Sequence, residues 1–292
     1  MKTTRPVVLL SLLLTVAAQL LAQAQTQSQP QSQTPTATQN ESWIDKYFAR
    51  VARNQAEQPH WITPVATITP RLEQEIRYDI FWQQQAAGYY AENYGGSKGL
   101  ELIPADKIEV LVNAPPYLVH NNPKQINGWG DETLLMKYRM LSKNEENGNY
   151  ILTAFLGYSI PTGSHKNGSP HASFTPYLAG GKGWGKFDFQ TTAGISLPTG
   201  QAKTIGQNVL WNLTGQYHLI KQIWPEVEMN YTYYHQGPHD GDTQVFMTPG
   251  VVFGRFPIHK RIAFTVGGGE QIAVTHFHTY NHGWILTMRM PF

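Results

Sequence analysis

The end of the chain carries the pattern that most constrains its fold. Within the last nine residues, Trp284–Phe292, an apolar side chain stands at every second position. These side chains are Trp284, Leu286, Met288, Met290 and Phe292. A period of two is that of a β-strand. A soluble protein rarely ends on an apolar strand, whereas the last strand of a membrane barrel closes on the first and faces lipid. The pattern predicts an all-β fold, an antiparallel transmembrane β-barrel.

The beginning of the chain predicts export. Two basic residues precede the apolar run Val7–Val16, and small residues follow it, so residues 1–24 are expected to be a signal peptide cleaved near Ala22–Gln25. The alternative, an uncleaved anchor helix, would need roughly 20 apolar residues, more than this run supplies. There is no cysteine, hence neither a lipoprotein acylation site nor a disulfide. We expect the outer membrane of a Gram-negative bacterium.

Composition narrows the function classes. The net charge is +2 and 14% of residues are charged, so no basic field for nucleic acid is expected. Mean hydropathy is −0.37, and beyond the leader no apolar run reaches the length of a spanning helix. Alternating strands hide their hydrophobicity from such averages, so a barrel is compatible with this value. No motif calls for a cofactor, and none is expected.

Three segments precede the expected barrel. Residues 25–41, rich in Gln, Ser, Thr and Pro, predict a disordered linker. Residues 42–58 place their apolar side chains at helical spacing and predict a short amphipathic helix. This helix could rest on the inner leaflet, plug the lumen, dock a partner or pack against the barrel base. His60–Arg71, which is bounded by Pro59 and contains Pro64 and Pro70, predicts an extended lead-in.

From Leu72 to Phe292, twelve strands can be written. They are Leu72–Gln84, Gly99–Pro104, Lys107–Pro115, Thr133–Leu141, Tyr150–Pro161, Phe174–Gly183, Lys186–Pro198, Asn208–Ile220, Trp224–Gln236, Thr243–Phe256, Arg261–Val274 and Thr279–Phe292. Short and long connections alternate, as in outer-membrane barrels. An even count places both termini on the periplasmic side. An error in the short strand Gly99–Pro104 would change the count to eleven or ten.

One parity of these strands carries charged side chains, which would face the lumen. They are Glu73, Glu75, Arg77, Asp79, Glu109, Lys137, Arg139, Asp188, Glu226, Glu228 and Arg289. Buried charges of both signs must pair or be solvated. One interpretation is a salt-bridge ladder that fills a narrow barrel. The other is a polar, gated path for a small solute, with the lumen partly filled.

Aromatic side chains are expected to mark the two membrane interfaces. Tyr150 and Trp224 fit the periplasmic girdle and Tyr158 fits the external one, while Trp284 and Phe292 are spaced to reach both. The expected partners are outer-membrane lipid and the barrel-assembly machinery, which would read the terminal aromatic Phe292.

The chain also resembles a known family, the outer-membrane barrels named for the meta-pathway of phenol degradation and often labelled transporters. The resemblance covers roughly Leu72–Phe292. It rests on Gly128–Asp131 leading into Lys137–Arg139, on Ser159–Gly163, on Thr175–Gly185 and on Ser196–Gly200. It implies uptake of a small aromatic or hydrophobic solute and supplies no catalytic motif.

Other functions find less support in the sequence. Eight histidines fall in or beside expected external loops, and His276 and His278 share a strand face, but no further ligands complete a metal site. A lipid-modifying enzyme would need a serine beside a histidine, and Ser159 and Ser196 have no such neighbour by sequence. We therefore expect a channel rather than an enzyme. A structural envelope barrel and a soluble secreted β-sandwich remain alternatives.

Overall fold

The computed structural model describes residues 42–96 and 98–292, so the expected signal peptide and linker, residues 1–41, lie outside the described residues. One helix, α2 (Trp43–Ala56), precedes the strands. The strands are β1 (Glu75–Gln84), β2 (Tyr90–Gly95), β3 (Gly99–Ala105), β4 (Ile108–Asn113), β5 (Tyr117–His120), β6 (Gly128–Trp129), β7 (Glu132–Lys143), β8 (Tyr150–Ile160), β9 (Ser173–Trp184), β10 (Phe187–Pro198), β11 (Gln207–Tyr217), β12 (Ile223–His235), β13 (Thr243–His259), β14 (Ile262–Ala273) and β15 (His282–Pro291). A short helix, α3 (Ala202–Ile205), lies between β10 and β11.

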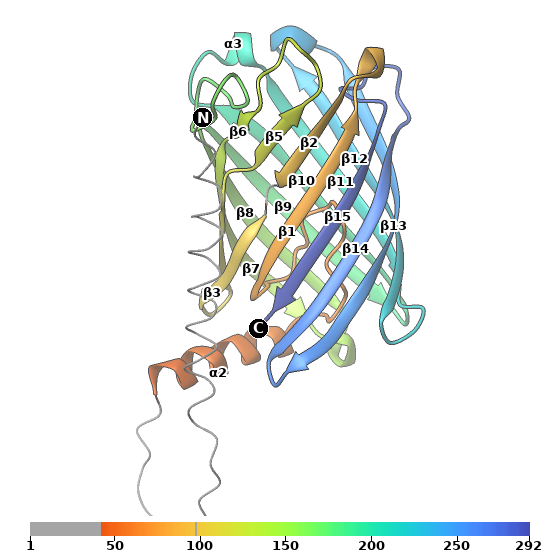
Figure 1. Ribbon diagram of the computed structural model, residues 1–292. Helices are drawn as coiled ribbons and strands as arrows, with labels where there is room; N and C mark the ends of the chain where they lie inside the picture. Colours follow the sequence, from red (N-terminus) through yellow and green to blue (C-terminus); the bar gives the residue numbers. More distant parts are fainter. Residues whose placement is uncertain (1–41, 97) are drawn as a thin grey trace, which may run out of the picture. The chain divides into compact units, whose positions relative to one another are not determined.

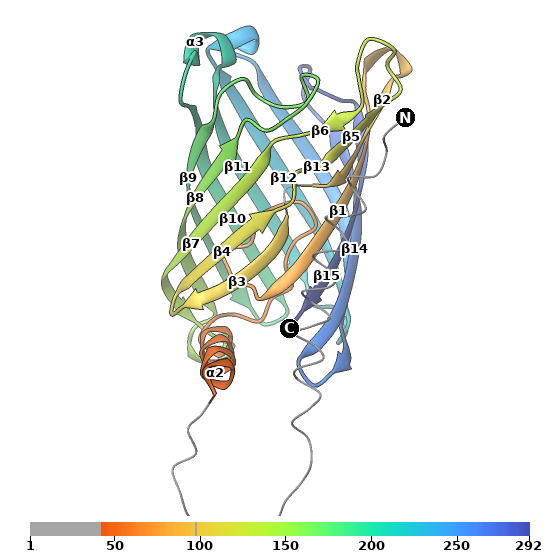
Figure 2. The ribbon, with the colours of Figure 1, turned by 60° about the vertical axis from the view of Figure 1, so that its left-hand side comes forward.

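These strands form a single closed antiparallel barrel (Figures 1 and 2). β15 returns to pair with β1 along its whole length, with Trp82 opposite Trp284 and Arg77 opposite Arg289. The apolar strand that ends the chain therefore closes the wall, as the sequence predicts. Closure leaves no edge of unpaired peptide groups, the condition for a sheet within lipid.

Three strands of the wall are each made of two segments. β2 and β3 both pair with β1. In the next strand of the wall, β5 pairs with β2 and β4 pairs with β3. In the strand after that, β6 pairs with β5 and β7 pairs with β4. The barrel thus has twelve strands, the number predicted. Gly96, the pair Pro115–Pro116, and Gly130 lie at the three breaks. The sequence reading missed β2, β5 and β6 and placed them in loops.

The two faces of the wall differ in chemistry. In β15, Trp284 and Leu286 are 53% and 44% exposed, whereas Thr287 and Arg289, on the opposite face, are 0% and 2% exposed. The same alternation runs through β1, where Glu75, Arg77 and Asp79 are buried. An apolar exterior and a polar interior are those of a transmembrane barrel. No helix among the described residues is long and apolar enough to cross a membrane.

The two ends of the barrel also differ. One end, called the base here, carries α2 and the chain end at Phe292, and α3 lies at the opposite, loop end (Figure 1). The turns at the base are short, as at Asp106–Lys107 and Gly185–Lys186. The longer connections, such as 161–172 and 274–281, lie at the loop end. The predicted alternation of connection lengths is therefore confirmed.

Helix α2 lies against the base. Its Asn54 side chain donates to Asp106 Oδ1 (3.0 Å) and accepts from the Lys107 N–H (2.8 Å). Val51 packs with Leu72 and Ile103 in a small buried cluster. Of the four interpretations of this helix, packing against the barrel base is the one the contacts support. The helix does not plug the lumen.

One expected girdle residue is misplaced. Tyr150 and Trp284 are exposed on the outer face, and Tyr158 stacks on Phe174 (4.7 Å between ring centroids). Trp224, in contrast, is 8% exposed and lies inside, where its ring stacks on His218. The reason is parity, because Trp224 is two residues from the inward-facing Glu226 and must share its side of the strand. The periplasmic-girdle role expected for Trp224 was wrong.

Candidate functional site

The lumen holds a segment of the chain itself. Residues 57–74, called the lumen loop here, leave α2, turn at Val65 inside the barrel and return to β1 without regular secondary structure (Figures 1 and 2). Gln58 closes the loop, because its Nε2 donates to the Leu72 carbonyl (2.8 Å) and its Oε1 accepts from the Leu72 N–H (2.9 Å). The expected extended lead-in is therefore a plug, which the sequence reading did not foresee.

Arginines hold one side of the loop tip. Arg77 Nη2 donates to the Val65 carbonyl (2.5 Å), and Arg289 Nη2 donates to the Pro64 carbonyl (2.6 Å). Arg289 also donates to the carbonyl of Thr63. Arg77 and Arg289 face each other across the β1–β15 seam, and both donate to the Pro64 carbonyl, so the first strand and the closing strand bind adjacent carbonyls of the tip.

Glutamates of β12 hold the other side of the tip. Glu226 Oε1 accepts from the Val65 N–H (2.8 Å). Glu228 accepts from the N–H groups of Ala66 (2.7 Å) and Thr67 (2.5 Å). A buried segment without a strand or helix ladder must find partners for its peptide groups elsewhere. The carboxyl oxygens of Glu226 and Glu228 supply these partners.

The returning arm is bound in the same way, but by more strands. Thr192 donates to the Ile68 carbonyl (2.9 Å), Thr153 to the Pro70 carbonyl (2.6 Å) and Lys137 Nζ to the Arg71 carbonyl (3.1 Å). These donors come from β10, β8 and β7, so the loop crosses a large part of the inner wall.

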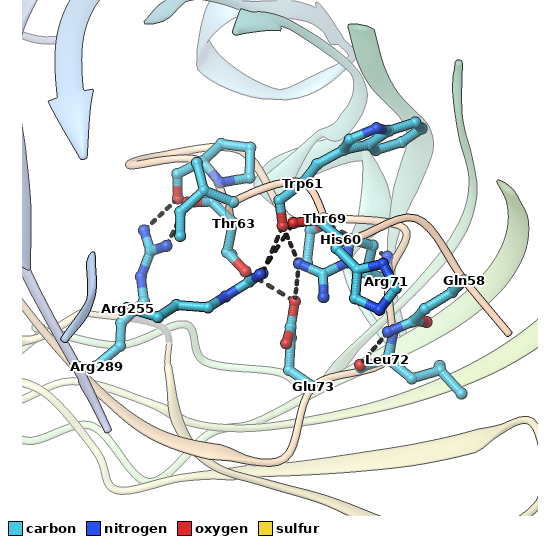
Figure 3. A network of polar contacts seen from close by, with 12 residues as sticks. Gln58, His60, Trp61, Thr63, Thr69, Arg71, Leu72, Glu73, Arg255 and Arg289 are labelled. Atoms are coloured by element: carbon cyan, nitrogen blue, oxygen red, sulfur yellow. Dashed lines mark hydrogen bonds and ion pairs between the residues drawn. The ribbon is translucent and has the colours of Figure 1, made fainter. Parts of the chain in front are cut away.

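The entering arm lies near the base. Figure 3 shows the carbonyls of His60 and Trp61 facing two guanidinium groups, those of Arg71 and Arg255. Arg255 Nη1 and Nη2 lie 3.0 Å and 2.7 Å from the His60 and Trp61 oxygens. Arg71 also pairs with Glu73 at 3.1 Å. The entering arm is thus fixed both to the wall and to the returning arm of the loop.

A contact between the loop and a base turn completes the anchoring. Glu145, in the β7–β8 turn, accepts from the His60 N–H (2.5 Å), and its Oε2 lies 2.8 Å from His60 Nδ1. Burial raises the pKa of Glu145, but the hydrogen bonds from His60 outweigh it and hold the pKa below its ordinary value. This carboxylate is therefore ionised and bound at neutral pH.

Apolar contacts fill the remaining space around the tip. Ile62 and Val65 of the loop pack with Trp224, Val252 and Ile285 of the wall. Ile68 packs against a second cluster, which contains Leu111, Leu135, Phe155 and Ala179. The plug therefore has a small hydrophobic core of its own, in addition to its charged contacts.

The structure places all eleven predicted lumen residues inside the wall, each at most 5% exposed. Some form the expected ion pairs, such as Arg77 with Asp79 (2.9 Å) and Lys137 with Glu109 (2.9 Å). Six of them also bind peptide groups of the loop, namely Arg77, Glu109, Lys137, Glu226, Glu228 and Arg289. Sequence reasoning did not select Glu101, Gln190 or Arg255, which join this network. The parity of Gln190, two residues after Asp188, already placed it inside.

Part of the loop-end half of the lumen is lined by a chain of neutral groups. Asn230 Nδ2 donates to Asn212 Oδ1 (3.1 Å), Gln271 Nε2 to Asn230 Oδ1 (3.2 Å), and the Tyr280 hydroxyl to Gln271 Oε1 (2.6 Å). Tyr280 also stacks on Phe246, with 4.2 Å between ring centroids. Amides and aromatic rings here bind chiefly one another.

The histidines of the loop end make ordinary contacts. His278 lies within hydrogen-bond distance of the Thr275 carbonyl and of Asn281 Oδ1 (both 3.0 Å). His235 and His239 lie 3.8 Å and 3.6 Å from Asp240 and Asp242, respectively. Among residues 42–96 and 98–292, no group of three His, Asp or Glu side chains could hold a metal ion.

Comparison with known proteins identifies the fold. No family model matches the chain, and no curated protein matches it. Among solved structures, the COG4313 outer membrane channel from Pseudomonas putida F1 is similar, with 14% identity and a TM-score of 0.50 over 79% of this chain and 98% of that one. The NanC porin aligns at 8% identity and a TM-score of 0.48, covering 74% and 98%. The similarity to the first of these is one of fold.

Proposed function

We propose that the protein is an outer-membrane channel for small solutes, exported by its signal peptide and oriented with its base toward the periplasm. The observation that carries this proposal is the lumen loop: a closed transmembrane barrel holds, across its bore, a segment that is not part of the wall. A barrel of this size stands between filled eight-stranded barrels and open porins.

The contacts of the loop favour a gate over a permanent filling. Its tip is held at peptide groups by four side chains, Arg77, Arg289, Glu226 and Glu228. These side chains would remain on the wall as a polar lining if the loop withdrew. A polar lining then solvates a path, which an apolar core could not do.

The loop-end half supports the class of solute. Phe246 and Tyr280 provide aromatic groups beside the Asn230 and Gln271 amides, a chemistry that suits a small aromatic or hydrophobic solute with one polar group. The family resemblance carried by Ser159–Gly163 and Ser196–Gly200 points the same way. We propose transport rather than catalysis, on the closed barrel and the segment that crosses its bore.

Recording of single channels in planar bilayers tests the proposal. The wild-type protein should show small or gated conductance, because the loop crosses the bore. The double variant Glu226→Gln/Glu228→Gln weakens the bonds to three N–H groups of the tip and should raise the mean conductance.

Glu270→Gln is the matched control. Glu270 lies opposite Trp284 on the outer face of the barrel, so the same chemical change there should leave the conductance unchanged. Large, constantly open steps in the wild-type protein would contradict the plug. Absence of conductance in every variant, with the barrel folded, would contradict the channel.

The terminal aromatic stays a prediction about assembly. Phe292 ends the chain at the base, and its N–H donates to the Gln74 carbonyl (3.0 Å). Recognition of this end by the barrel-assembly machinery is proposed on that position and on the strand pattern that leads to it.

A further inference from the structure

A second feature of the base is a cavity between the lumen loop and the wall. Its volume is about 400 Å³, within the range of pockets that bind small molecules. The lining residues are His60, Ile62, Glu145, His218, Lys221, Trp224, Gly254 and Arg255. They belong to the lumen loop and to three turns or strand ends at the base of the barrel.

The wall is shaped so that two cations meet at this cavity. The pairing of β13 with β14 shifts register between Phe253 and Phe256, and such a bulge re-aims the side chain that it contains. Arg255 lies in the shifted stretch and reaches the loop. The Gly254 N–H donates to the Gln222 carbonyl (3.0 Å), which brings the turn that carries Lys221 beside Arg255.

The positive charge of Arg255 is partly compensated, because Glu145 lines the same cavity and the buried Glu73 and Glu75 lie close enough to interact with it. Arg255 uses two of its five N–H donors on the His60 and Trp61 carbonyls. Lys221 makes no hydrogen bond or ion pair that the described part of the chain shows. The carboxylate in the cavity lining, Glu145, is already bound twice by His60. An incoming anion would therefore meet the remaining N–H donors of Arg255 and the ammonium group of Lys221.

The rest of the lining is flat and apolar. The rings of His218 and Trp224 are stacked at 3.9 Å with 6° between their planes, and Ile62 lies beside them. The Nε2 atom of His218 is buried and has no hydrogen-bond partner among the described residues. A stacked aromatic pair next to cations suits a planar body that carries a negative group.

We propose that this cavity binds a small organic carboxylate with a planar apolar body, the carboxylate on Arg255 and Lys221 and the body against Trp224, His218 and Ile62. The idea that such a carboxylate is the solute carried by the channel rests on the proposed function. As a binding site, it stands on the cavity alone.

Calorimetry on the full-length protein in detergent tests the site, with benzoate as probe and with benzamide and acetate as matched probes. Benzoate should bind about ten-fold more tightly than either, because benzamide lacks the charge and acetate lacks the ring. Lys221→Gln should weaken benzoate binding about ten-fold, whereas Lys260→Gln, in the neighbouring base turn, should not. Both lysines are exposed, so folding should not change.

Equal binding of the three probes, or equal benzoate affinity in wild type and Lys221→Gln, would overturn the proposal. Channel recordings separate it from the proposed function. Benzoate binding without conductance would leave the site and remove the channel, whereas conductance without benzoate binding would leave the channel and remove the site.

Discussion

The two halves of the lumen solve the problem of a polar interior in different ways. In the base half, charged side chains such as Arg289 and Glu228 bind the peptide groups of the lumen loop. In the loop-end half, neutral amides such as Asn230 and Gln271 bind one another. The halves belong to the same strands, since Glu228 and Asn230 are neighbours on one face of β12. The two halves therefore do not differ because they are built from different strands.

The difference follows from what each half must satisfy. An irregular segment brings unpaired N–H and C=O groups into the bore, and an ionised partner binds them more strongly than an amide does. Wall side chains that meet only other wall side chains can pair as neutral groups without the cost of burying a charge. The charged side chains of the base half thus bind loop backbone and also pair with one another, as Arg77 does with Val65 and with Asp79.

The largest expected effect is loss of an arginine at the loop tip. Arg289→Gln removes a buried guanidinium that donates to the Thr63 and Pro64 carbonyls, of which Pro64 keeps only a longer bond from Arg77, so the free energy of unfolding should fall by about 3 kcal/mol. Urea unfolding in detergent micelles measures this change. A loss below about 1 kcal/mol would mean that the loop does not depend on this residue.

Crowding of the entering arm should have the next largest effect. A Cβ at Gly181 would lie 2.5 Å from Trp61 Cζ3, so Gly181→Ala must displace the loop and should cost about 1 to 3 kcal/mol. At the adjacent Gly180 the nearest atom is 3.4 Å away, and Gly180→Ala should be nearly neutral. Unfolding and bilayer conductance of the two variants, measured together, test this. Equal behaviour of the pair would contradict the placement of Trp61.

The neutral half should respond less. Asn230→Ala removes amide contacts to Asn212 and Gln271 in a region without loop backbone, apart from a long contact to Thr67. The expected loss in the free energy of unfolding is about 1 kcal/mol, without a change in resting conductance. A loss as large as that of Arg289→Gln would erase the distinction between the halves.

Acid should loosen the base half slightly. The pKa of Glu145 is below its ordinary value of 4.5, so its contact with His60 is fully present above that pH and is lost as the pH falls through the lowered pKa. Glu145 is 40% exposed, and the effect should be small. Conductance recorded from pH 7 down to about 3 should rise only at the acid end. In Glu145→Gln that acid-dependent part should be absent.

The sequence could predict the wall because the wall obeys a period. Alternation along the strand is enough to place Trp284 on the outer face and Arg289 on the inner face. The same rule places Trp224 inside with Glu226. The strands β2, β5 and β6 were not predicted because they are short and because breaks such as Pro115–Pro116 interrupt the alternation.

The lumen loop could not be predicted in the same way. Its position depends on peptide groups, which every residue carries, so residues such as Val65 and Ala66 give no signal of their own. The one sequence signal was the number of charged side chains that face the lumen, which need partners in addition to one another. The contact of Arg255 with the loop was not predicted either, because Arg255 lies at a register shift in β13, where the alternation of the two faces is interrupted.

Protection of the loop tip tests the central claim most directly. The chain has no cysteine, so Val65→Cys introduces a single thiol at a residue that is 0% exposed, and Thr162→Cys provides an exposed control in a loop-end connection. In intact outer-membrane vesicles and in detergent, a charged thiol reagent should label Thr162→Cys quickly and Val65→Cys only after unfolding. Equally fast labelling of both thiols in the folded barrel would show that the loop does not occupy the lumen.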